Sequence, residues 1–166
     1  MRVVYLDFDG VISVHGDYRI AQRVPKTASN IEKGISMMHP RLVANVDRLC
    51  RETGAVVVVS SSWRIAWPDD GLVAILRGAG LTVEVVGVTP RFPGEPRGAE
   101  IAADAKARGL SVEDFVILDD DSDMEPLERR WVQTFWGGLE PGFNEAALEK
   151  ALGLFAADAA GGVYVE

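Results

Sequence analysis

The sequence contains few of the residues that build disulfide frameworks and zinc sites. Of its 166 residues, one is cysteine and two are histidine. A disulfide within the chain is therefore excluded, and a zinc site made of cysteines and histidines would lack ligands. We interpret Cys50 as a buried helix residue, because an isolated cysteine usually behaves as a small apolar side chain. His15 and His39 stand apart from any cluster, and we interpret both as loop residues.

Long apolar runs and an excess of basic charge are also absent. No stretch is long enough to span a membrane, and Asp7 interrupts the apolar N-terminal run that a signal peptide would need. The formal net charge of -8 argues against a broad basic surface for non-specific nucleic-acid binding, although it leaves room for a local basic pocket. We therefore expect a cytoplasmic protein that does not bind membranes.

Apolar runs that favour strands alternate with patterns that favour helices along most of the chain. Strands are predicted at 3–6, 55–59, 82–86, 115–118 and 131–134. Helices are predicted at 40–53, 72–76, 99–107 and 144–155. Such alternation predicts an α/β fold, a Rossmann-like three-layer sandwich whose central parallel sheet of about five strands carries helices on both faces. We expect one domain over residues 1–155, with a hairpin or flap at 11–20, a loop at 23–40, and a loose C-terminal tail at 156–166.

Polar side chains follow three of the predicted strands directly. Asp7 and Asp9 end the first strand, Ser60–Ser62 follow the second, and the acidic run Asp119–Asp123 follows the fourth. Ligands of parallel sheets bind at the carboxyl ends of the strands, so we expect these groups to surround one pocket. Several carboxylates in one pocket repel each other unless a cation joins them, and an all-oxygen set favours magnesium. Because a carboxylate can attack phosphorus while a second acid moves the proton, the pattern indicates phosphoryl chemistry.

These same stretches resemble the motifs of a known superfamily. Asp7-Phe8-Asp9-Gly10-Val11 resembles motif I of the haloacid dehalogenase (HAD) superfamily phosphatases, Ser60 after its apolar strand resembles motif II, and Leu118-Asp119-Asp120 with Asp123 resembles motif IV. More narrowly, Ser60-Ser61-Ser62-Trp63-Arg64, and Val132-Gln133-Thr134 with Gly138-Leu139, are similar to the HAD domain of "Swiss Army Knife" RNA-repair proteins.

The resemblance implies a role for each matching residue. Asp7 would be the nucleophile and a magnesium ligand, and Asp9 the general acid and base, with its backbone carbonyl on the metal. Asp120 would be a direct metal ligand. The phosphoryl group would be held by Ser60, or by Ser61 if the register is shifted by one. The neighbouring acids Asp119 and Asp123 would support the metal waters or the motif III cation.

The lysine that the superfamily usually places before the third helix is missing. No lysine occurs between Lys33 and Lys106. Arg97 stands where the cation should be, and Arg91 is the alternative. Arginine stays charged and can hold a phosphate with two hydrogen bonds, so either residue could replace the lysine. Arg64, after the second strand, could also bind a phosphate or a carboxylate.

The tryptophans near Arg64 leave two interpretations open. Trp63 and Trp67 either pack in the core or offer an indole on which a base stacks. Residues 12–41 are too few for a full helical cap, so we expect a capless or minimally capped domain.

We therefore expect a magnesium-dependent phosphomonoester hydrolase that acts through an aspartyl-phosphate. Its substrate would be a phosphorylated small molecule, a nucleotide or a nucleic-acid end. A phosphotransferase with the same residues and a non-catalytic binding module of the same fold are the alternatives.

Overall fold

Five parallel strands form the central sheet of the computed structural model, which describes residues 1–16 and 24–160. In spatial order they are β3 (Val85–Val88), β2 (Ala55–Val59), β1 (Arg2–Leu6), β4 (Phe115–Asp119) and β5 (Trp131–Gln133). β1 and β4 are buried almost throughout, as expected for strands covered on both faces. Leu6 pairs with Val59 on one side and with Leu118 on the other, so β1 and β2 end level with one another and β4 extends one residue further.

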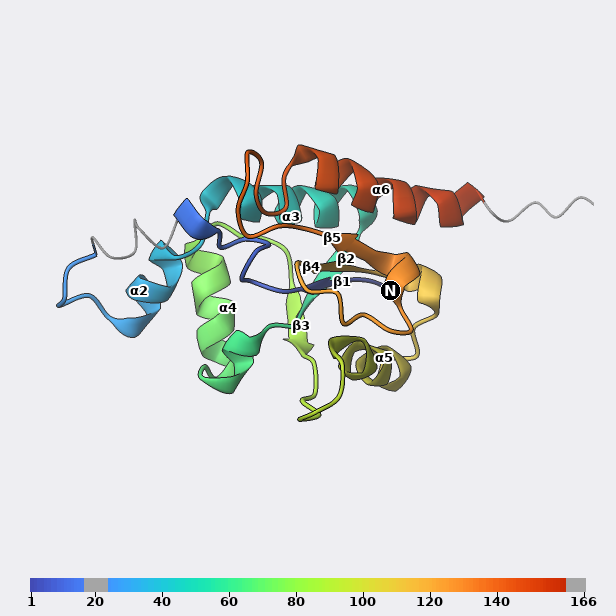
Figure 1. Cartoon of the computed structure of the whole chain (residues 1–166), viewed down its shortest axis with the longest axis horizontal. Coiled ribbons are helices and arrows are strands. Elements are labelled where there is room, and N and C mark those ends of the chain that lie inside the picture. Colours follow the sequence, from blue (N-terminus) through green and yellow to red (C-terminus); the bar gives the residue numbers. More distant parts are fainter. Residues whose placement is uncertain (17–23, 161–166) are drawn as a thin grey trace, which may run out of the picture.

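Helices cover both faces of this sheet, which confirms the predicted three-layer α/β architecture (Figure 1). The larger core cluster contains apolar residues of α3 (Pro40–Thr53), α4 (Asp69–Gly78) and α6 (Glu145–Ala160) on one face. The smaller cluster places α5 (Arg97–Ala107) against the opposite face. Tyr5 belongs to this second cluster, while its neighbours Val4 and Leu6 belong to the first, because successive side chains of a strand point to opposite faces.

The boundaries of α3 agree closely with the sequence pattern. Pro40 occupies the first turn, where its missing amide hydrogen is not needed. Gly54 ends the helix with a left-handed φ of 72° and donates its amide to the Cys50 carbonyl. Cys50 is buried, and burial raises the pKa of its thiol to about 12, so it has no thiolate character at neutral pH.

The predicted loop at 23–40 is wrong in part, because α2 (Asn30–Ser36) forms there. Ser29 and Glu32 form a capping box, in which each side chain accepts a hydrogen bond from the backbone amide of the other. The seven-residue helix carries too short an apolar pattern to stand out from its polar neighbours. It is stabilised by packing on α4, where Gly34 lies so close to Ile75 that a Cβ there would be 2.6 Å from its Cδ1. In the predicted hairpin or flap at 11–20, the described residues 11–16 contain a turn, an isolated bridge from Ser13 to Asp9, and no strand, and the rest lies outside the described residues.

Other boundaries differ from the predicted ones as well: α4, predicted at 72–76, extends over Asp69–Gly78, and α5 begins two residues before the predicted 99. β3 begins at Val85 rather than at residue 82, because the Asp47 carboxylate accepts hydrogen bonds from the Thr82 and Val83 amides and holds this segment outside the sheet. α6 continues to Ala160, five residues into the predicted C-terminal segment of 156–166, because its alanines keep helix propensity high. No helix in the described part of the chain combines the length and the apolar character needed to cross a membrane.

Candidate active site

The ends of β1, β2 and β4 bring three sets of polar residues to one edge of the sheet. The Asp7 amide donates to the Leu118 carbonyl at 3.0 Å, and the Ser60 amide donates to the Leu6 carbonyl at 2.8 Å. The hydrogen bonding of the sheet therefore continues one residue past the ends of β1 and β2, which fixes Asp7 and Ser60 beside the neighbouring strands. Asp7, Asp119 and Asp120 each contribute one carboxylate oxygen to a cluster in which these oxygens lie within 4.8 Å of one another.

The acids of this cluster are held in a poorly solvated place. Asp7 and Asp119 are 6% and 1% exposed. Burial is the main cause that raises the pKa of both carboxyl groups, and their mutual repulsion adds to it for Asp119. The Oδ2 atom of Asp119 has no hydrogen-bond partner among the described residues. The negative charge of these carboxylates is not fully balanced by hydrogen-bond donors or arginines, so the cluster can hold a metal ion. Its oxygen ligands suit a hard cation.

Arg97 is the cation nearest to these acids. Its Nη1 atom lies 3.8 Å from Asp7 Oδ1 and 3.5 Å from Asp119 Oδ2, and it also donates to the Ser60 carbonyl. The structure thus places Arg97, and not Arg91, against the Asp7 carboxylate. Its guanidinium lowers the pKa of Asp7, although less than burial raises it.

Asp123 fixes the start of α5, from which Arg97 projects. The Arg97 amide donates to Asp123 Oδ2 at 2.9 Å, and the Gly98 amide donates to the Asp123 carbonyl at 2.9 Å. A Cβ on Gly98 would lie 2.3 Å from the Glu125 carbonyl oxygen, so glycine is required for this close approach. Asp123 therefore acts on the helix that carries the arginine and is absent from the carboxylate cluster.

Glu100 is a component of the site that the sequence reasoning missed. It lies one helical turn after Arg97, is 5% exposed, and pairs with both Arg64 and Arg97. Its Oε1 atom accepts the Phe92 amide at 2.8 Å. Arg64 donates to the Ser61 carbonyl at 2.7 Å as well, while its buried Nε has no partner among the described residues. The spacing of three between an arginine and an acid on one helix was the available signal.

Asp9 lies beside this cluster but outside its set of oxygens. Trp63 Nε1 donates to Asp9 Oδ2 at 3.0 Å, and the indole packs on Phe8 and Trp67. Burial raises the pKa of Asp9 more than the Trp63 hydrogen bond lowers it. A carboxyl group with a raised pKa suits a proton donor. The tryptophan therefore both packs in the core and orients an acid.

Two serines follow β2, next to the end of β1 in the sheet. Ser60 Oγ is buried and has no hydrogen-bond partner within the described chain. Hydrogen bonding with the Ser61 hydroxyl lowers the pKa of Asp7, so this hydroxyl reaches the carboxylate. The Ser60 hydroxyl is thus free to donate to an oxyanion, whereas the Ser61 hydroxyl is already engaged by the Asp7 carboxylate.

Gly10 makes room for Asp120. Its φ of 75° lies in the left-handed region, and a Cβ there would lie 2.3 Å from Asp120 Oδ2. The glycine of the Asp-Phe-Asp-Gly stretch is therefore required both by the turn and by the approach of the second strand end.

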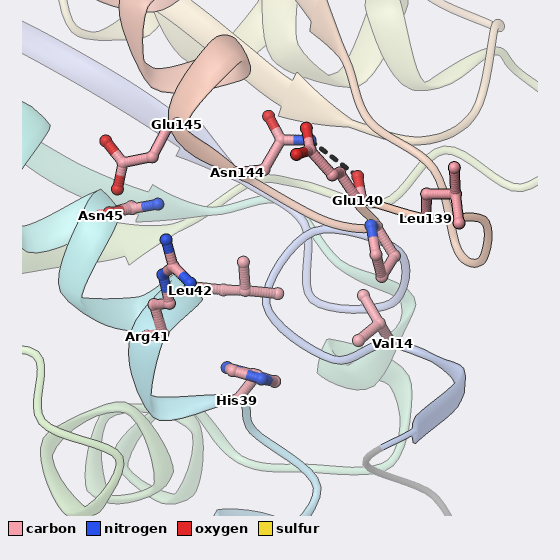
Figure 2. A pocket seen from close by; sticks show the side chains of 10 residues that line it. Val14, His39, Arg41, Leu42, Asn45, Leu139, Glu140, Asn144 and Glu145 are labelled. Atoms are coloured by element: carbon pink, nitrogen blue, oxygen red, sulfur yellow. Dashed lines mark hydrogen bonds between the residues drawn. The ribbon is translucent and has the colours of Figure 1, made fainter.

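A separate hollow of about 230 Å³ lies on α3 and the loop before α6, and Figure 2 shows His39, Leu42 and Asn45 on one side of it and Glu140 and Asn144 on the other. None of the acids of the cluster lines it.

One comparison with known proteins identifies the family of the chain. The sequence profile of the HAD domain in Swiss Army Knife RNA repair proteins matches residues 3–146. No curated protein matches the chain. The matched range contains β2 to β5, all of β1 except Arg2, and every acid of the carboxylate cluster, which fits a HAD active site. Since the match extends over most of its length, the chain belongs to the family of HAD domains found in Swiss Army Knife RNA repair proteins.

Proposed function

We propose that the protein is a magnesium-dependent phosphomonoester hydrolase that acts on the phosphorylated end of a nucleic acid. The observation that carries this proposal is the buried cluster of Asp7, Asp119 and Asp120 at the strand ends, with Arg97 against it. The nucleic-acid end as substrate class is taken from the RNA repair proteins in which this HAD domain family occurs.

With Asp7 as nucleophile and Asp9 as general acid and base, the proposed reaction has two displacement steps. In the first, a carboxylate oxygen of Asp7 attacks phosphorus, an aspartyl-phosphate forms, and the bond from phosphorus to the substrate oxygen breaks. Asp9 gives its proton to that leaving oxygen. In the second, Asp9 takes a proton from water, the water oxygen attacks phosphorus, and the bond to Asp7 breaks, which releases inorganic phosphate and restores both acids.

The groups around Asp7 would hold the phosphoryl oxygens during both steps. The Ser60 hydroxyl is buried without a partner, and the guanidinium of Arg97 lies 3.8 Å from Asp7 Oδ1. Donors fixed in a poorly solvated place stabilise negative charge without having to reorganise. Arg64 and Glu100 keep the Arg97 guanidinium in place, since Glu100 pairs with both arginines.

The three carboxylates fit a divalent cation. Asp7, Asp119 and Asp120 offer only oxygen, which magnesium prefers, and one Asp119 oxygen is buried without a hydrogen bond. The Asp9 backbone carbonyl, implied by the family resemblance, would add a fourth oxygen. Bound there, magnesium would neutralise the charge that the phosphoryl group brings to these acids.

The test is hydrolysis of 3′- and 5′-phosphorylated oligonucleotides, nucleotides and glycerol phosphate, with magnesium and with a chelator. We expect magnesium-dependent release of phosphate, which Asp7→Asn abolishes. Asp69→Asn changes an exposed acid at the start of α4 and serves as the matched control. Unchanged hydrolysis in Asp7→Asn would exclude it as the nucleophile. No hydrolysis of any phosphomonoester by the wild type would instead favour a non-catalytic binding module.

A further inference from the structure

A second hollow, of about 200 Å³, adjoins the carboxylate cluster on the side of α5. It is lined by Arg64, Arg91, Phe92, Arg97 and the residues around them. Arg97 also approaches Asp7, so a phosphate at Asp7 and a group in this hollow can belong to one molecule. Pockets for complete drug-sized ligands begin at about 300 Å³, so this hollow suits one unit of a longer molecule.

The hollow offers positive charge that the fold does not fully use. Arg64 is 8% exposed in its side chain, yet its buried Nε atom has no hydrogen-bond partner among the described residues. Arg91 is exposed, and no hydrogen bond or ion pair involves it in the described part of the chain. The acids Glu100 and Asp123, in contrast, are already engaged by arginines and backbone amides. An arginine without a partner and a second arginine with one unused donor, both beside a phosphate site, favour a second anionic group on the substrate.

The same hollow offers apolar side chains to the solvent. Phe92 is 40% exposed and Ile65 is 57% exposed, and both line it. The Phe92 backbone is held in place, because its amide donates to Glu100 and its carbonyl accepts from Glu95. An exposed aromatic ring on a fixed backbone, next to arginines, is the combination that binds a nucleic-acid base by stacking and its backbone by charge.

We propose that this hollow holds the nucleotide next to the reacting phosphate, with its base against Phe92 and its phosphodiester at Arg91. This assignment rests on the proposed function and makes a single-stranded nucleic-acid end, rather than an isolated phosphate ester, the preferred substrate. Glu95, an exposed residue that also lines the hollow, carries the opposite charge and should weaken phosphate binding there.

The first test compares kcat/KM for a phosphorylated pentanucleotide with kcat/KM for glycerol phosphate. Phe92→Ala should lower the ratio of the two at least about fivefold, which is the lower range for loss of one stacked base. Arg91→Gln should lower it as well, whereas Glu95→Gln should raise it. Phe135→Ala and Arg41→Gln are the matched controls, because both residues are exposed and neither lines this hollow.

The second test measures binding of a labelled pentanucleotide, in the Asp7→Asn background, over a series of salt concentrations. Arg91→Gln should reduce the slope of log K against log salt by about 0.7, the value for one phosphate contact on a single strand. If Phe92→Ala and Arg91→Gln match their controls in both tests, the assignment of the hollow is wrong. A wild type that binds the pentanucleotide through these residues but hydrolyses no phosphate would contradict the proposed function and leave this assignment standing. Failure to bind it would overturn the assignment.

Discussion

Gly10→Ala tests whether glycine is needed in the turn after β1 to leave space for the Asp120 side chain in the site. The chain provides a control for the backbone cost, because Gly10 and Gly54 have φ values of 75° and 72°. A Cβ on Gly54 would meet nothing within 4 Å, whereas one on Gly10 would lie 2.3 Å from Asp120 Oδ2 and 2.6 Å from Asp120 Cβ. Gly54→Ala therefore measures the left-handed conformation alone, at about 1–2 kcal/mol.

Gly10→Ala adds a collision that a side-chain rotation cannot relieve. Rotation about the Cα–Cβ bond moves the Asp120 oxygens but leaves its Cβ in place, so the loop after β4 must retreat by roughly 1 Å. Overpacking of this kind costs about 1–3 kcal/mol beyond the control. The expected total of roughly 2–5 kcal/mol is measured by urea unfolding of both variants.

The same displacement should weaken magnesium binding, because metal sites tolerate ligand shifts of only about 0.2 Å. We expect the magnesium concentration for half-maximal hydrolysis to rise at least about tenfold in Gly10→Ala and to stay unchanged in Gly54→Ala. Calorimetric titration with magnesium gives the same comparison without an activity. Equal stability and equal magnesium affinity in the two variants would refute the claim that Gly10 makes room for a metal-binding Asp120.

Two further predictions concern buried charges. Glu100→Gln leaves the Arg64 charge in its buried place without a carboxylate, so we expect a loss of about 3–5 kcal/mol in unfolding free energy together with a lower kcat, while Glu149→Gln on exposed helix surface should change neither. Wild-type stability in Glu100→Gln would show that the ion pair does not hold the site. Burial alone would raise the pKa of Asp47, but hydrogen bonds from Thr82 and Val83 and the Arg51 charge together lower it. The Asp47 carboxylate therefore contributes fully to the free energy of unfolding above its unfolded-state pKa of about 3.9, and this contribution is lost as pH falls through the lower folded-state pKa. The difference in unfolding free energy between wild type and Asp47→Asn, measured by urea unfolding, should shrink at low pH. A difference that stays constant with pH would contradict this.

The sequence by itself determined the strand ends and their chemistry. The apolar runs at 3–6, 55–59 and 115–118 have clear ends, and Asp7, Ser60 and Asp119 follow these runs directly. Parallel pairing then places such neighbours at one edge, whatever the loops do. Elements whose stability comes from tertiary contacts were predicted less well: α2 depends on packing against α4, and the start of β3 depends on a side chain of α3.

Tertiary structure alone decided which charged side chains meet. Several arginines lie near the predicted third helix, and their distances to Asp7 depend on how α5 is anchored. Asp123 in the loop after β4 and the close approach at Gly98 on α5 decide this. Glu100 gains its role only because the chain brings Arg64 to it from 36 positions away. Local patterns specify the elements and the residues at their ends, whereas the partners of a buried charge depend on contacts between distant segments.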